Sequence, residues 1–192
     1  MRTKDFDENE ILRKAITIFW QKGYNATSLY DLIDGLGIGR SSIYHSFGDK
    51  HTLYLKALDL YQQEGTARIT TILNNNPSVK DAVANLFQMI ISEIVNDEHS
   101  KGCFKINSEV ELAPHDEPTK KLICDDNTII EDALYQAILK GQKDKSISAS
   151  KNPRALAHFI CTTVAGMRVY AKFRNDRQFF EDIATTALSV LD

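Results

Sequence analysis

Apolar residues recur at helical spacing through most of this chain, and few residues interrupt the pattern. Near the start, Ile11, Leu12, Ala15, Ile18 and Phe19 follow the spacing of one helix face. Only 9 glycines and 4 prolines occur among the 192 residues, which is below average usage. Scarce helix breakers favour long uninterrupted helices, and no segment indicates a strand. The sequence therefore predicts an all-α protein of about nine helices.

Polar segments and breakers divide the chain into two parts. Asp7 is a candidate N-cap, and Gly23 stands where a left-handed glycine would end the first helix. Further along, Ser78 can cap a helix that follows an asparagine-rich break, and Pro153 can occupy a first helical turn. The resulting prediction is a small three-helix domain over residues 1–48. A larger helical bundle over residues 49–192 follows it.

Charge and cysteine content narrow the functional classes. The formal net charge of −3 gives no general attraction to nucleic acid or to an anionic membrane, so any DNA contact must be local. No apolar run reaches the ~18 residues of a membrane span, and the first residues do not resemble a signal peptide. Three cysteines without a CxxC pair do not predict a zinc ribbon. We expect a cytoplasmic protein without membrane, metal or cofactor.

The stretch from Thr27 to Lys50 encodes two short helices separated by a glycine-rich turn. This is the helix-turn-helix pattern, in which the second helix enters the DNA major groove. In the second helix, about residues 40–46, only Ile43 and Phe47 are expected to face the core. The remaining residues are polar donors or have polar tips. A helical protein that does not bind DNA can show the same pattern with a merely solvated face.

Residues 11–53 resemble the N-terminal domain of TetR/AcrR-type transcriptional regulators. The opening helix ends in Phe-x-x-x-Gly-Tyr at residues 19–24, and a Thr-capped helix follows. Residues 37–53 then match the phrase Gly-Ile-x-x-x-x-Ile-Tyr-x-x-Phe-x-x-Lys-x-x-Leu. The resemblance implies a homodimeric repressor that binds a palindromic DNA operator and releases it on binding a small-molecule effector. Gly39 departs from the family's usual Ser or Thr cap.

The resemblance also implies roles for individual residues. Phosphate contacts are expected from Thr27, Ser28, Tyr44 and Lys50. Base-edge contacts are expected from Arg40, Ser41, Ser42 and His45. Tyr44 can also be a half-buried packing residue, and His45 can simply be exposed.

The C-terminal bundle resembles the family less specifically. Residues 102–111 are similar to a Gly-Cys-x-x-x-Asn-x-x-x-Glu phrase of one branch, with Glu111 a candidate for its last position. An effector pocket needs an apolar lining with a few polar anchors. The residues expected to line it are Phe87, Ile91, Cys103, Phe104, Asn107, Tyr135, Phe159, Thr163 and Met167. The alternative is that these are ordinary core residues, with Cys103 an inert thiol rather than a chemical sensor.

The last two expected helices favour a dimer interface. Ala155, Ala157, Ala165 and Gly166 permit close helix approach, and Leu188 belongs to an extended apolar face. We find no catalytic motif and no metal-ligand spacing, so the sequence predicts no enzyme. The alternative function is a helical dimeric interaction module without DNA binding. The pair Tyr44 and Lys50 argues against it, because a scaffold does not need both beside a polar face.

Overall fold

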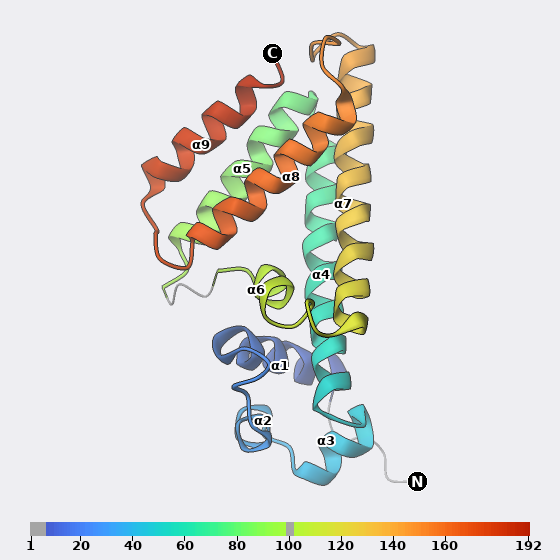
Figure 1. The fold of residues 1–192 in the computed structure, drawn as a ribbon, viewed down its shortest axis with the longest axis vertical. Helices are drawn as coiled ribbons and strands as arrows, with labels where there is room; N and C mark the ends of the chain where they lie inside the picture. Colours follow the sequence, from blue (N-terminus) through green and yellow to red (C-terminus); the bar gives the residue numbers. More distant parts are fainter. Residues whose placement is uncertain (1–6, 99–101) are drawn as a thin grey trace. The chain divides into compact units, whose positions relative to one another are not determined.

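The computed structural model describes residues 7–98 and 102–192, and within these ranges it contains nine helices and no strand (Figure 1). The helices are α1 (Glu8–Lys22), α2 (Leu29–Leu36), α3 (Arg40–Phe47), α4 (Lys50–Asn75), α5 (Val79–Val95), α6 (Phe104–Glu111), α7 (Glu117–Lys143), α8 (Pro153–Tyr170) and α9 (Arg177–Ser189). The predicted all-α class and helix-turn-helix are confirmed. None of the described helices combines the length and apolar character that crossing a bilayer requires.

The chain forms two compact units, and neither is continuous in sequence. The first unit comprises Met1–Glu64 and Cys103–Ile123, and the second comprises Gly65–Gly102 and Cys124–Asp192. The first unit therefore contains α1 to α3, the first part of α4, α6 and the start of α7. The sequence analysis divides the chain once, at residue 48. The compact units differ from that division because α6, which follows α5 in the chain, packs with the N-terminal helices.

A group of aromatic rings lies within the core of the first unit. Tyr54 of α4 meets Phe19 of α1 edge-on with ring centroids 5.1 Å apart, and Phe104 of α6 meets Tyr54 at 5.7 Å. The Tyr54 hydroxyl donates a hydrogen bond to Ser108 Oγ at 2.6 Å. Burial raises the pKa of Tyr54 to about 12. These contacts attach α6 to the helices that precede it in the first unit.

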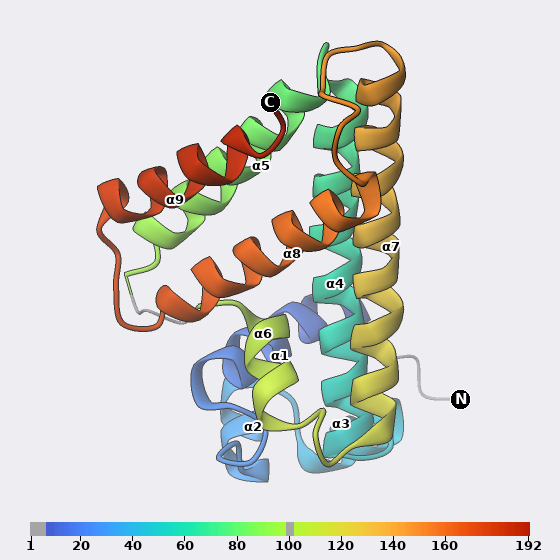
Figure 2. The same cartoon turned by 45° about the horizontal axis from the view of Figure 1, so that its top comes forward.

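The second unit has a mainly aliphatic core. Residues of α5 such as Val83, Phe87 and Ile91 are 0% exposed. They belong to one cluster with Ile160 of α8 and Phe180 of α9. Figure 2 shows α9 lying along α5. The central position of α5 explains why apolar residues cover most of its circumference.

Most predicted helix ends are confirmed, with two differences. Asp7 and Ser78 are N-caps, as the sequence predicts. Gly23 has φ 80° and ψ 167°, so its φ is positive but its conformation is not left-handed helical. Gly141 does not end α7, which continues to Lys143. Side-chain packing of Ile147 against Gly141 accompanies this continuation.

Candidate nucleic-acid interface

The N-terminus of α2 is fixed by reciprocal hydrogen bonds. Ser28 Oγ accepts from the Asp31 N–H, and Asp31 Oδ2 accepts from the Ser28 N–H at 2.8 Å. Lys22 Nζ lies 2.5 Å from Asp31 Oδ1. The bond from Lys22, followed by the one from Ser28, lowers the pKa of Asp31 to about 2. These bonds set the position at which α2 begins.

Glycines shape the turn between α2 and α3. Gly37 ends α2 in the left-handed conformation, with φ 69° and ψ 22°, which favours glycine. Gly39 is the N-cap of α3 and supplies no side-chain hydrogen bond. The departure from the usual Ser or Thr cap therefore leaves the first N–H groups of α3 without a side-chain acceptor at the cap position.

Helix α3 separates apolar and polar residues as the sequence predicts. Ile43 and Phe47 are 1% and 2% exposed and belong to the core of the first unit. The exposed residues of α3 are Arg40, Ser41, Tyr44 and His45, whereas Ser42 is half-buried. The Arg40 guanidinium lies over the Tyr44 ring, 5.4 Å from its centroid. The two largest side chains of the polar face thus lie against each other at the surface.

Thr27, predicted to contact a phosphate at the helix N-terminus, has a buried side chain. Thr27 is 1% exposed, and its hydroxyl donates to the Gly23 carbonyl oxygen at 2.6 Å. The hydroxyl therefore closes the loop between α1 and α2 and does not face solvent. Ser28, the next residue, is exposed at the helix N-terminus.

Lys50 is the first residue of α4, and its ammonium group lies over an aromatic ring. Nζ is 4.3 Å from the centroid of the Tyr24 ring. Burial lowers the pKa of Lys50, while the nearby carboxylates of Glu111 and Asp31 act in the opposite direction. The side chain is half-buried and has a defined position. A cation held this way can still present part of its surface to an anion.

Several residues near this interface were missed by the sequence analysis. Tyr24 holds Lys50, and Glu111 accepts hydrogen bonds from the loop that contains Tyr24. His51 Nε2 lies 3.1 Å from the Asp116 carboxylate. Tyr30 of α2 is 76% exposed. Tyr24 and Glu111 stand in the two family phrases, which gave neither residue a role in this interface, and the sequence analysis found no signal for His51, Asp116 or Tyr30.

The residues predicted to line an effector pocket fall in both units. Cys103, Phe104 and Asn107 belong to the first unit, where Phe104 is 2% exposed within the aromatic core. The other six belong to the second unit. Among them Phe87, Ile91 and Met167 are core residues, and Phe159 is 43% exposed. The pocket prediction therefore remains without direct support from their positions.

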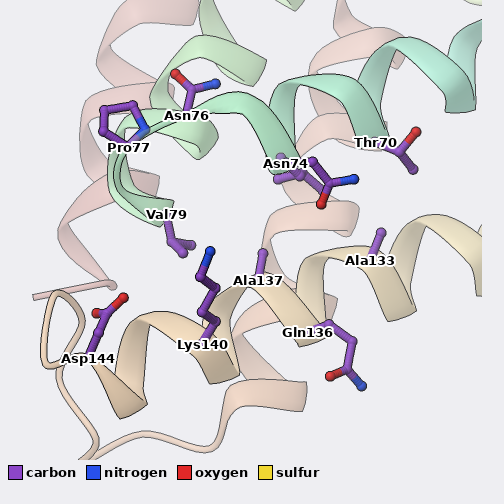
Figure 3. Close-up of a pocket in the computed structure, with 11 residues that line it drawn as sticks. Thr70, Asn74, Asn76, Pro77, Val79, Ala133, Gln136, Ala137, Lys140 and Asp144 are labelled. Atoms are coloured by element: carbon purple, nitrogen blue, oxygen red, sulfur yellow. The ribbon is translucent and has the colours of Figure 1, made fainter.

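A cavity of about 360 Å³ lies in the second unit between the end of α4, the start of α5 and the last turns of α7 (Figure 3). The residues that line it are Thr70, Leu73, Asn74, Asn76, Pro77, Val79, Ala133, Gln136, Ala137, Lys140 and Asp144. None of the nine predicted residues is among them. Helical periodicity could not reveal this cavity, because its lining combines an interhelical turn with one face of a distant helix.

None of the three cysteines, all of which the structure describes, forms a disulfide. Cys103 is the N-cap of α6, and its Sγ lies 3.5 Å from the Tyr61 hydroxyl. In the part of the chain that the structure describes, no three His, Cys, Asp or Glu residues are grouped as metal ligands would be. His99 and Lys101 lie outside the described residues.

Two family models match the chain. Residues 11–57 match the family described as bacterial regulatory proteins, tetR family. Residues 79–187 match the tetracyclin repressor-like C-terminal domain. The first match covers α1 to α3 and the start of α4, where the interface residues lie.

Full-length relatives agree with the family models. The chain is 32% identical over 192 residues to the HTH-type transcriptional regulator YezE of Bacillus subtilis (strain 168), covering 100% of this chain and 99% of that protein. It is 29% identical to the HTH-type transcriptional repressor ComR of Escherichia coli (strain K12), covering 97% and 90%. A solved structure of a cysteine mutant of the TetR family regulator CifR, complexed with a 26-base-pair operator DNA, has a TM-score of 0.88 and 26% identity, with 100% of both chains covered. The chain therefore belongs to the TetR family of bacterial regulatory proteins and is a transcriptional regulator.

Proposed function

We propose that this protein binds operator DNA through α2, α3 and the first residue of α4, and that a small-molecule effector controls this binding. The observation that carries the proposal is the division of α3 into an anchored apolar side and an exposed polar side. The CifR structure with operator DNA supports it at the level of the family. We assign DNA binding to residues 1–48, together with Lys50.

Individual residues have distinct roles in this proposal. Ser28 at the α2 N-terminus, the Tyr44 hydroxyl and the Lys50 ammonium contact phosphates. Arg40, Ser41, Ser42 and His45 face base edges, where an arginine can bond guanine O6 and N7 together. Phosphate contacts position the protein on the duplex, and base contacts select the sequence.

We further propose that the protein acts as a homodimer. On α8, Phe159, Val169 and Tyr170 are 43%, 44% and 45% exposed, and Gly166 on the same helix has open space around its Cα. Apolar side chains of this size at the surface mark an interaction site. A two-fold axis would present two α3 helices to major grooves about 34–36 Å apart, which requires a palindromic operator.

We assign the effector to the second unit, which lies within the predicted effector-binding domain of residues 49–192. The cavity of about 360 Å³ falls within the size range of small-ligand sites, about 300–1,000 Å³. Helix α4 is continuous from Lys50 to Asn75, so the residue at its start and a lining residue of the cavity, Thr70, lie on one helix. A ligand can release DNA only if it binds the released state more tightly. We also propose a cytoplasmic location, which suits the proposed DNA partner.

The salt dependence of DNA affinity tests the phosphate contacts. Lys50→Ala and Tyr44→Phe should weaken binding to all duplexes about equally, because phosphates carry no sequence information. Loss of Lys50 should reduce the slope of log affinity against log salt by about one per half-site. Tyr44→Phe removes no charge and should leave the slope unchanged. An unaltered slope for Lys50→Ala would remove that residue from the interface.

A further inference from the structure

Glu111 lies at an electrostatically unfavourable position in its own helix. It is the last residue of α6, where the partial negative charge of the helix end disfavours a carboxylate. Its carboxylate oxygens instead accept two hydrogen bonds from another segment. Oε2 accepts from the Tyr24 N–H at 3.0 Å, and Oε1 accepts from the Asn25 N–H at 2.8 Å. Glu111 thus binds the loop between α1 and α2 by both oxygens.

The loop is shaped to admit this carboxylate. A Cβ added to Gly23 would lie 2.7 Å from Glu111 Oε2, closer than side-chain packing permits. Gly23 also has φ 80°, a conformation that residues with a side chain rarely adopt. Both observations concern the residue directly before the two N–H donors. A glycine at this position therefore allows the carboxylate to reach the backbone.

The residue whose N–H binds Glu111 also holds the proposed phosphate ligand. The Tyr24 ring supports the Lys50 ammonium at 4.3 Å from the ring centroid. The same ring packs against Tyr54 at 4.9 Å and Phe19 at 6.3 Å, so core residues fix its orientation. A continuous set of contacts therefore runs from the Glu111 carboxylate through Tyr24 to Lys50, entirely within the first unit.

We propose that Glu111 is a positioning residue for DNA binding, which acts through Tyr24 to hold Lys50 where a phosphate can bind it. The proposal rests on the proposed function of Lys50. Cys103, the N-cap of α6, directly follows Gly102, the residue at which the chain leaves the second unit. Any shift of α6 that withdraws Glu111 frees the loop and loosens the support of Lys50.

The direction in which one substitution changes DNA affinity distinguishes a positioning role of Glu111 from that of an ordinary surface charge. DNA is a polyanion, so removal of a carboxylate that only repels phosphates should strengthen binding. Glu111→Gln keeps the side-chain shape but replaces one acceptor oxygen with an NH2 group, which cannot accept from a backbone N–H. We expect it to weaken binding about tenfold, the scale of one hydrogen bond to a charged group.

The experiment uses the full chain and a duplex that the wild-type protein selects from a random pool. Glu117→Gln is the control, because it removes the same charge from a side chain that is 80% exposed in the first unit. Affinity is measured for wild type, Glu111→Gln, Glu117→Gln, Lys50→Ala and the double variant Glu111→Gln/Lys50→Ala. Thermal unfolding of each variant checks folding, and Glu111→Asp, which keeps the charge but shortens the side chain, replaces Glu111→Gln if that variant is unfolded.

We expect Glu111→Gln to weaken DNA binding about tenfold and Glu117→Gln to leave DNA binding unchanged or slightly stronger. In the Lys50→Ala background, Glu111→Gln should weaken DNA binding by less than about a further twofold. Equal behaviour of the two Gln variants would overturn the proposal. A full tenfold loss in the Lys50→Ala background would also overturn it, because Glu111 would then act independently of Lys50.

A measurement without DNA tests the set of contacts from Glu111 through Tyr24 to Lys50, called the relay, independently of the proposed DNA binding. Protons on the Lys50 ε-carbon should show an upfield NMR shift from the Tyr24 ring, and Glu111→Gln should reduce it. An unchanged shift would overturn the relay whether or not the protein binds DNA. A reduced shift in a protein that selects no duplex would leave the relay intact and reject the proposed function.

Discussion

The two compact units are both built from helices, but different kinds of contact hold them together. In the first unit, individual polar atoms fix the segments, as when Glu111 binds two loop N–H groups and Tyr54 binds Ser108. In the second unit, aliphatic side chains of α5 pack in a large apolar cluster, and ion pairs such as that of Arg168 with Glu93 lie beside it. Directional contacts tie a residue type to its position, whereas an aliphatic core tolerates exchange of similar side chains. Short motifs are therefore expected to be easier to recognise in the first unit.

The largest expected effect concerns the surface of the second unit. Gly166→Arg places a charge and bulk on α8 where a Cβ meets nothing within 4 Å in the protomer, so the protomer should fold normally. In the proposed dimer the same side chain would enter an apolar interface. We expect monomers and a loss of operator affinity of more than about hundredfold, since one half-site must then bind alone.

Sedimentation velocity measures the oligomeric state of Gly166→Arg. Gly65→Arg is the control, because its Cβ position in α4 is also open. A Gly166→Arg protein that remains a tight dimer would place the interface on another surface.

Core substitutions compare the two units directly. Phe104 of the first unit and Phe87 of the second are 2% and 0% exposed. If both are core residues, Phe104→Ala and Phe87→Ala should each lower the free energy of unfolding by about 3–5 kcal/mol. Denaturant unfolding measures this change. Val110→Ala, at a residue 73% exposed, should cost less than about 0.5 kcal/mol. A loss below about 1 kcal/mol for either Phe would instead indicate a loosely packed, pocket-lining position.

A smaller effect is expected at the main ion-pair group of the second unit. Arg168 of α8 and Arg68 of α4 both bind Glu93 of α5, but their side chains are 14% and 59% exposed. Arg168→Leu should lower the free energy of unfolding by about 1–3 kcal/mol, because it leaves Glu93 partly buried with one partner fewer. Arg68→Leu should cost less than about 1 kcal/mol. Equal losses of unfolding free energy for Arg168→Leu and Arg68→Leu, measured by denaturant unfolding, would show that burial does not determine the strength of these ion pairs.

The smallest expected effect is the acid response of the α2 cap. The pKa of Asp31 is lowered from 3.8 to about 2 in the folded protein. A lowered pKa means that the Asp31 contribution is fully present above the unfolded value and is lost as the pH falls through about 2. NMR titration of the Asp31 side chain measures the pKa directly. A midpoint near 3.8 would show that the bonds from Lys22 and Ser28 do not form in solution.

The sequence predicts the first unit well because its constraints are local. Ile43 and Phe47 are four residues apart on one short helix, so periodicity alone places both in the core. Gly37 belongs to the predicted glycine-rich turn and ends α2 by its own backbone conformation, whereas the N-cap of α2 is Ser28 and not the Thr27 that the family phrase indicates. The position of Glu111 is a different case, because it binds residues 86 and 87 positions away in the chain. Local patterns carry no information about such a partner.

The second unit shows what periodicity cannot distinguish. Phe87 and Ile91 of α5 have the same spacing whether they line a pocket or fill a core, and the structure places both in the core. The lining of the cavity beside Lys140 and Asn74 mixes polar and apolar residues, which a search for apolar stripes does not detect. Thr27 illustrates the same limit within the first unit, since its burial depends on a hydrogen bond to Gly23 in the preceding loop.

Selection of duplexes from a random pool tests the central claim most directly. The wild-type protein should enrich a palindromic site whose half-sites lie about one helical turn apart. Arg40→Ala should relax the preference at one symmetric position, at a cost of roughly 1–3 kcal/mol for each bidentate arginine–guanine pair that the substitution removes. Enrichment of no sequence by a folded, dimeric wild-type protein would contradict the account and favour an interaction module that does not bind DNA.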